Sequence, residues 1–396
     1  MTVPLKVSTL KIPTLPKRRA LDIPIRPTRA EISQSALLHN LEQTKRWVAP
    51  VPILAVVKAN AYGHGAVDVA RTLEAGGIWG LAVALVEEGI ELRQTGIRAR
   101  IVVMGGAYEG AWPLMVAHKL TPTLFRREHL RGFGQLLRSR GEEAEVHIKI
   151  DTGMGRNGVV EGELEAFVEE LKAWPELRVE GLCTHLACAE QVGAELTALQ
   201  LQRFEKALGC FQRHGINPAW RHIANTAATL SMPQARDGRL FNLVRPGGAI
   251  YGLFPKGWPK SLPLKRVLSW KTGITHLKWL SPGDSVSYDA TWRATQATCV
   301  ATLPVGYADG FGRDYSNKGE ILLRGRRAGV IGRVAMDFCL VDVTSIEGAA
   351  VGDEVTLLGE EGEECLDADG LAERIGSLHY EVLCGIGARV PRILVE

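Results

Sequence analysis

The length of 396 residues predicts two or three domains, although one α/β barrel can by itself use about 250 residues. The composition, 46% hydrophobic and 23% charged, is ordinary for a globular enzyme, and no apolar run reaches the roughly 18 residues of a membrane span. Since 47 basic residues nearly balance 44 acidic ones and form no long run, we expect neither a nucleic-acid nor a membrane partner.

Residues 1–25 are expected to form a disordered extension. The first 21 residues contain basic side chains, three prolines and no acidic side chain, and they lack the apolar core of a secretory signal. The seven cysteines are odd in number and scattered, which predicts neither a disulfide framework nor a metal site. These features favour a cytoplasmic protein.

Short apolar runs alternate with longer amphipathic segments over residues 26–265. Eight runs read as strands: 53–57, 80–85, 101–104, 121–125, 146–150, 181–186, 220–223 and 243–244. Helix-like segments such as 67–75, 164–173 and 197–214 lie between them. This alternation predicts an α/β fold whose N-terminal part is a TIM-like (β/α)₈ barrel. An open doubly wound sheet would be expected to carry GxGxxG after its first strand, where this chain has KANAYGHG.

The pattern changes in residues 266–396. Short β-rich runs separated by Gly and Pro turns predict a C-terminal, mostly antiparallel β domain. The runs are 273–280, 299–304, 320–323, 328–331, 338–343 and 354–358, followed by a helix near 368–375 and a strand at 390–395.

Unusual polar residues follow the predicted barrel strands, where the active site of such a barrel is built. Lys58 comes directly after the apolar run 53–57. A lysine at a strand end is commonly a solvated surface residue, whereas a catalytic lysine needs a site that lowers its pKa. The loop that follows contains Tyr62 and the glycines Gly63 and Gly65, and it opens a helix whose N–H groups can meet an anion.

The stretch AVVKANAYGHG at 55–65 resembles the pyridoxal-phosphate attachment motif of the alanine racemase family. Further motifs carry the resemblance from RPTRAEI at 26–32 to RVPR at 389–392, leaving only residues 1–25 outside it. They are KIDTGMGR at 149–156, TH at 184–185, HIANTAA at 222–228, VRPG at 244–247, VSYDAT at 286–291, GYADG at 306–310 and MD at 336–337.

The resemblance implies a pyridoxal 5′-phosphate cofactor bound covalently by Lys58, and two catalytic residues, Lys58 and Tyr288, on opposite faces of the substrate Cα. Tyr288 would reach in from the β domain of a second subunit. Without the resemblance, Tyr288 would be interpreted as a partly buried tyrosine of the β domain. The implied cofactor-binding residues are Lys58, Tyr62, Arg156, His185, Asn225, Thr226, Arg245, Gly247 and Gly248. Arg156 and Met336 would bind the substrate. Supporting positions are Lys149, His222, Tyr307, Arg313, Asp337 and Glu190.

Arg245 has a distinctive implied role. In this family an arginine faces the pyridine nitrogen of the cofactor, and an arginine can donate to that nitrogen but cannot readily accept its proton. His222 and His185 are expected to hold Arg245 and Tyr288 in a hydrogen-bonded chain. Each could equally be a buried histidine of the core whose hydrogen bonds are satisfied there. Lys149 matches a lysine that is carbamylated in many relatives.

The sequence therefore predicts a homodimeric racemase that interconverts the L and D forms of a small amino acid, alanine, and supplies D-alanine for peptidoglycan. The alternatives are a serine or broad-specificity racemase, a related decarboxylase, or a non-catalytic cofactor-binding protein. Some family members have a tyrosine before the closing RVPR, where this chain has Ala388. That difference predicts extra room beside the phosphate and a looser preference for alanine.

Overall fold

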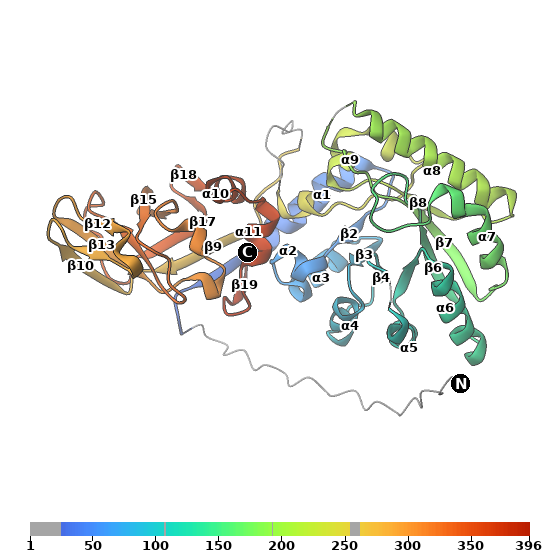
Figure 1. The fold of residues 1–396 in the computed structure, drawn as a ribbon, viewed down its shortest axis with the longest axis horizontal. Coiled ribbons are helices and arrows are strands. Elements are labelled where there is room, and N and C mark those ends of the chain that lie inside the picture. Colours follow the sequence, from blue (N-terminus) through green and yellow to red (C-terminus); the bar gives the residue numbers. More distant parts are fainter. Residues whose placement is uncertain (1–24, 107, 192, 254–261) are drawn as a thin grey trace.

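The computed structural model describes residues 25–106, 108–191, 193–253 and 262–396 (Figure 1). The predicted extension at 1–25 therefore lies, except for its last residue, outside the described residues. Two bodies of structure lie side by side, a strand-and-helix barrel and a β-rich domain. Among the described helices, none combines the length and apolarity needed to cross a membrane.

The barrel is built on parallel strands that pair in chain order, as the alternating pattern predicts. They are β2 (Leu54–Val56), β3 (Gly80–Val83), β4 (Arg100–Val103), β5 (Thr121–Leu124), β6 (Ala144–Lys149), β7 (Leu177–Cys183) and β8 (Trp220–His222). The eighth position is taken by the segment around Val244, which forms a parallel bridge with Ile53. The amide of Arg245 donates to the carbonyl of Ala224 on the other side, so this segment closes the ring.

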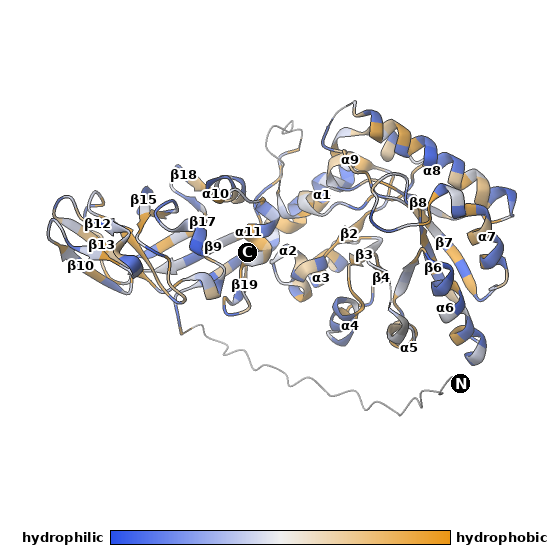
Figure 2. Cartoon of the chain, in the orientation of Figure 1, coloured by the Kyte–Doolittle hydropathy of each residue, from blue (hydrophilic) through white to orange (hydrophobic). Residues whose placement is uncertain are grey.

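Helical segments precede and connect the barrel strands, and the longer ones among them bury one apolar face. They are α1 (Gln34–Val48), α2 (Lys58–Tyr62), α3 (Ala66–Ala75), α4 (Val86–Gln94), α5 (Trp112–Ala117), α6 (Arg127–Arg140), α7 (Leu164–Lys172), α8 (Glu195–Arg213) and α9 (Thr226–Ser231). Hydrophobic and hydrophilic residues alternate along α8 in Figure 2. Its buried side chains Phe204, Ala207 and Phe211 recur at helical spacing, which is why this segment forms a surface helix.

The second domain is a ten-stranded sheet in which most neighbours are antiparallel, as predicted. Its strands are β1 (Arg29–Ser33), β9 (Leu268–Gly273), β10 (His276–Leu280), β13 (Thr298–Leu303), β14 (Glu320–Leu323), β15 (Arg326–Ile331), β16 (Cys339–Asp342), β17 (Glu354–Glu361), β18 (Glu364–Leu366) and β19 (Arg392–Val395). A separate hairpin joins β11 (Ser285–Val286) to β12 (Trp292–Arg293).

The first strand of the chain lies in this second sheet. β1 pairs antiparallel with β9 and parallel with β19, and α1 then leads into the barrel. A division of the chain near residue 265 therefore assigns β1 to the barrel by sequence, although β1 pairs with strands of the second sheet. The ranges 26–265 and 266–396 remain a prediction.

Two helices of the C-terminal part reach the barrel mouth. α10 (Ala368–Ile375) is followed by α11 (His379–Gly385), which packs against α2. The approach is close: a Cβ atom at Gly63 would lie 2.1 Å from the carbonyl oxygen of Leu383. The guanidinium of Arg392 also donates to the carbonyl of Gly63 at 2.9 Å. The loop after Lys58 is therefore held by residues more than three hundred positions away.

Candidate active site

A cavity of about 600 Å³ opens at the carboxyl ends of the barrel strands. Its lining includes every predicted site residue of the barrel. These are Lys58, Tyr62, Lys149, Arg156, His185, Glu190, His222, Asn225, Thr226, Arg245, Gly247 and Gly248. The position agrees with the rule that strand ends carry the chemistry of such barrels.

Lys58 is followed by a turn with unusual backbone geometry. The four residues Ala59 to Tyr62 all have φ near +53°, and Gly63 follows with φ of +84°. Left-handed backbone costs roughly 1–2 kcal/mol for each residue other than glycine. Strain of this kind persists only where surrounding contacts hold it, and such sites are commonly functional.

Two side chains that sequence reasoning missed hold this turn. The carboxylate of Glu88 accepts the amide of Ala59 at 2.6 Å and, through its other oxygen, the amide of Ala84 at 2.8 Å. The side chain of Asn60 accepts the amide of Ala66 at 2.8 Å, which joins the turn to α3. Glu88 gave no sequence signal because its acceptor role depends on bringing β3 beside β2.

The cavity contains several basic groups. Burial lowers the pKa of Lys58, and the nearby guanidinium of Arg156 lowers it further. Burial also lowers the pKa of Lys149. A lowered pKa raises the fraction of neutral amine, which is the nucleophilic and proton-accepting form.

Arg245 is buried and hydrogen-bonded on several sides. It donates to Nδ1 of His222 at 2.8 Å and to the carbonyl of Thr184 at 2.9 Å. A longer contact of 3.3 Å reaches Nδ1 of His185. Burial, strengthened by the Arg245 charge, lowers the pKa of His185 to about 3 and holds that of His222 well below its ordinary range. Both imidazoles are therefore neutral acceptors for the guanidinium.

One end of the cavity forms a cradle of hydroxyl groups and glycine backbone. The hydroxyl of Thr226 accepts the amide of Gly247 at 2.9 Å. A Cβ at Gly247 would lie 2.5 Å from the phenol oxygen of Tyr62, so a larger residue there would require Tyr62 to shift. Asn225 lines the cavity and caps α9, since its side chain accepts the amide of Ala228 at 2.9 Å.

Tyr380 is a second residue that sequence reasoning missed. It projects from α11 into the cavity lining, with its ring centre 5.4 Å from that of Tyr62. A Cβ at Gly248 would lie 2.7 Å from its phenol oxygen. Ala388 instead lines a separate smaller cavity with Gly63 and Arg392. The expectation of empty space at Ala388 beside the phosphate site was therefore wrong, because Tyr380 supplies a phenol there.

The predicted site residues of the C-terminal domain lie elsewhere. Tyr288, Tyr307, Arg313, Met336 and Asp337 do not line the cavity. Tyr288 is 67% exposed and Met336 is 52% exposed, which is unusual for large apolar side chains. They share a surface: Arg313 pairs with Asp289 at 3.7 Å, and the amide of Ala308 donates to the carbonyl of Met336.

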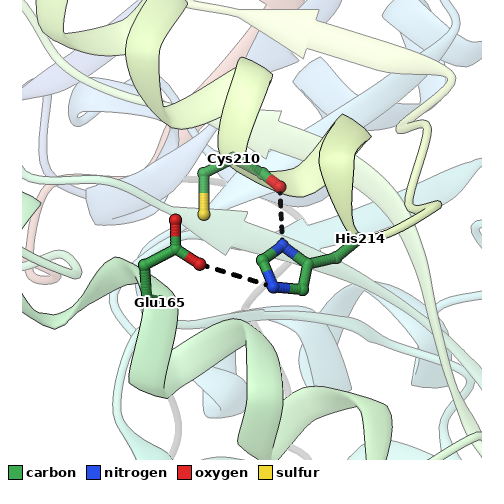
Figure 3. Close-up of side chains that lie close together, drawn as sticks. All are labelled: Glu165, Cys210 and His214. Carbon is green, nitrogen blue, oxygen red and sulfur yellow. Dashed lines mark hydrogen bonds and ion pairs between the residues drawn. The ribbon is translucent and has the colours of Figure 1, made fainter.

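A third group of reactive side chains lies between two outer helices of the barrel. Glu165 on α7 meets Cys210 and His214 on α8 and its end, and these are the three metal-type donors that gather among the described residues (Figure 3). Their groups already have partners. His214 bonds to the carbonyl of Cys210 at 2.9 Å, and Glu165 accepts from Arg213 at 3.0 Å.

The chain is similar to known proteins over most of its length. Profiles of the alanine racemase N-terminal and C-terminal domains match residues 32–255 and 267–394. An alanine racemase of Geobacter sulfurreducens is 42% identical over 377 residues, covering 94% of this chain and 98% of that protein.

Two solved structures are similar over the same length. An alanine racemase of Clostridium difficile is 36% identical, with a TM-score of 0.88, covering 94% of this chain and 97% of its own. That of Bartonella henselae, with covalently bound pyridoxal phosphate, is 26% identical at a TM-score of 0.84 and covers 94% and 100% of the two chains.

Proposed function

The chain belongs to the alanine racemase family, and on that premise we propose that it interconverts L- and D-alanine with pyridoxal 5′-phosphate held by Lys58. One observation carries the assignment of the site. The amine of Lys58 and the buried guanidinium of Arg245 line the same cavity.

The residues present fit the cofactor. Its phosphate would occupy the cradle of Tyr62, Thr226, Gly247 and Gly248, where the hydroxyls of Tyr62 and Thr226 meet glycine backbone at one end of the cavity. Arg245 would donate to the pyridine nitrogen, and His185 with Asn225 would line the ring. When bound, pyridoxal phosphate withdraws electrons from the substrate Cα and so makes its proton removable.

Racemisation needs one proton donor and one acceptor on opposite faces of the substrate Cα. The amine of Lys58, with a pKa lowered by burial, would exchange the proton on one face. The phenol of Tyr288 would serve the other face from a partner subunit, which agrees with its 67% exposure in the single chain.

Arg156 would bind the substrate carboxylate and the cofactor hydroxyl, with the main-chain N–H of Met336 from the partner as a second donor. Lys149 is a candidate for carbamylation, because that reaction needs a neutral amine and burial lowers its pKa. A carbamate would replace a cation beside Arg156 by an anion able to orient the guanidinium.

The enzyme would then be a homodimer. Tyr307, Arg313 and Asp337 would surround the entrance from the partner, and Glu190 from the same chain, where it lines the cavity. A cytoplasmic location agrees with seven unpaired cysteines. The product D-alanine would serve peptidoglycan synthesis.

The decisive experiment is Lys58→Ala. We expect the purified variant to lose the visible absorbance of the bound cofactor and essentially all racemisation, because the covalent anchor and one base disappear together. Lys265→Ala, which changes a lysine outside the cavity, is the control. Normal turnover by Lys58→Ala without added amine would contradict the assignment, and an assay across amino acids would test the preference for alanine.

A further inference from the structure

A column of polar side chains runs through the barrel core below the cavity. Behind Arg245 lies His222, the last residue of β8, and behind His222 lies His147 in the middle of β6. Nε2 of His222 is 2.8 Å from Nδ1 of His147. Both imidazoles are fully buried, in a region that such barrels normally fill with branched apolar residues.

The direction of every hydrogen bond in this column is fixed by its first member. A guanidinium can only donate, so Nδ1 of His222 accepts from Arg245. A neutral His222 then carries its proton on Nε2 and donates to Nδ1 of His147. His147 in turn carries its proton on Nε2. Burial, with the charges of Arg100 and Arg245, lowers the pKa of His147 to about 3, which keeps it neutral.

The N–H at the end of this column points to a carboxylate. Nε2 of His147 lies 3.6 Å from Oε2 of Glu180, and among the described residues neither buried atom has a hydrogen-bond partner. An unpaired buried donor opposite an unpaired buried acceptor calls for an explanation. The other oxygen of Glu180 forms a close ion pair with Arg100, at the start of β4.

A β-bulge in β7 brings Glu180 to this position. Val146 is in register with Val179 and His147 with Gly181, so Glu180 is the extra residue and is turned out of the normal alternation. The next residue is glycine for a steric reason. A Cβ at Gly181 would lie 2.7 Å from the His147 ring.

We propose that His147 and Glu180 are positioning residues for Arg245: they support the tautomer of His222 that accepts from Arg245, and thereby set the strength with which Arg245 donates to the pyridine nitrogen. This inference rests on the proposed cofactor site. If it is correct, the ion pair of Glu180 and Arg100, near the opposite end of the barrel, influences the hydrogen bond to the cofactor in the cavity. Outer-shell partners tune a bound ligand in the same way.

Glu180→Gln is the direct test, because it keeps the shape and changes the hydrogen-bonding pattern. The amide oxygen would accept from Arg100, which leaves the NH₂ group facing the N–H of His147. Two opposed donors would disfavour this tautomer of His147 and disturb His222 in turn. Glu145→Gln is the matched control, since Glu145 also contacts Arg100, at 3.4 Å, and lies on the same strand as His147.

The readouts are nitrogen NMR of ¹⁵N-labelled histidine in the protein with and without cofactor, and of ¹⁵N-labelled pyridoxal phosphate bound to it. We expect His147 and His222 to carry Nε2 protons in the parent protein. Glu180→Gln should change these histidine signals, shift the pyridine nitrogen signal and lower kcat by about tenfold with little change in KM. Glu145→Gln should leave the histidine signals, the pyridine nitrogen signal, kcat and KM unchanged.

Unchanged histidine and pyridine signals in Glu180→Gln would overturn the proposal, as would equal changes in Glu145→Gln. If the histidine signals change and the pyridine signal does not, the link to the cofactor is wrong. Failure of the parent protein to bind the cofactor would instead overturn the proposed function, and the histidine signals of the free protein would still test the column. If Glu180→Gln does not fold, Glu180→Asp replaces it, with the same signals shifted less.

Discussion

The carboxylate of Glu88 lies 2.6 Å from the main-chain nitrogen of Ala59, the residue that follows the proposed catalytic lysine. Its second oxygen accepts the amides of Ala84 at 2.8 Å and Leu85 at 3.0 Å. One charged side chain thus satisfies donors of two neighbouring barrel loops and holds the left-handed turn that presents Lys58.

Glu88→Gln should therefore weaken both the fold and cofactor binding. The amide can accept with only one oxygen, so at least one main-chain donor loses its partner, at a cost of about 1–3 kcal/mol. Chemical denaturation should show this loss in the free energy of unfolding, and titration should show weaker pyridoxal phosphate binding. Glu87→Gln changes the exposed neighbour and should alter neither quantity.

Tyr288→Phe should impair Cα proton exchange unequally for the two enantiomers. Removing a positioned acid–base group typically costs 10²–10⁴-fold, and only the face served by Tyr288 loses it. In deuterated solvent, Cα hydrogen exchange should persist more from the enantiomer handled by Lys58. Equal losses from both enantiomers would contradict a division of labour between two bases.

His64 should make the fold sensitive to acid. It is buried, its Nδ1 bonds to the carbonyls of Ala61 and Tyr62 at 3.0 Å, and burial lowers its pKa to about 4. Below its ordinary pKa near 6.5 the unfolded chain binds a proton that the folded chain does not, so stability is present above 6.5 and falls as the pH drops toward about 4. His64→Gln should remove about 1.4 kcal/mol per pH unit of slope in that window. A matched slope in the parent and the variant, measured by denaturation at several pH values, would show that His64 is not the titrating group.

The barrel could be predicted from the sequence because its apolar runs and polar strand ends each follow a local rule. The eight runs include the short one at 243–244, which closes the ring through Val244. The predicted site residues that follow the barrel strands line one cavity, since parallel strands bring their carboxyl ends together.

What the sequence could not predict depends on contacts between distant segments. Glu180 lies just before the predicted strand 181–186, and only the bulge in β7 turns it toward His147. Tyr380 lies outside the predicted elements and far along the chain from the cofactor motifs, and the packing of α11 on α2 brings it to the cavity. β1 falls within the predicted range 26–265, and it lies in the other sheet because its partners β9 and β19 belong to the C-terminal part of the chain.

Mixing two inactive proteins should test the shared site. If Tyr288 acts across the subunit boundary, a mixed dimer of Lys58→Ala and Tyr288→Phe chains contains one site with both defects and one with neither. Activity should therefore recover in part after subunit exchange, which size-exclusion chromatography of differently tagged chains can establish. No recovery after proven exchange would mean that each chain builds its own site.

The last prediction concerns the wall of the substrate pocket. The phenol of Tyr380 stands beside Gly248 and Tyr62, and burial raises its pKa to about 12, so it remains a hydrogen-bond donor at neutral pH. Tyr380→Ala should weaken pyridoxal phosphate binding and open space on the order of one aromatic ring.

A looser pocket should discriminate less between alanine and serine, a difference worth about 1–3 kcal/mol even in a fitted site. We expect kcat/KM for serine to rise relative to alanine in Tyr380→Ala, whereas Tyr380→Phe should mainly weaken cofactor binding because it keeps the ring and removes the hydroxyl. Ala388→Tyr is the control, since Ala388 lies in the separate cavity and its substitution should leave the ratio unchanged. If instead Ala388→Tyr sharpens the preference for alanine and Tyr380→Ala does not relax it, Ala388 and not Tyr380 shapes the pocket.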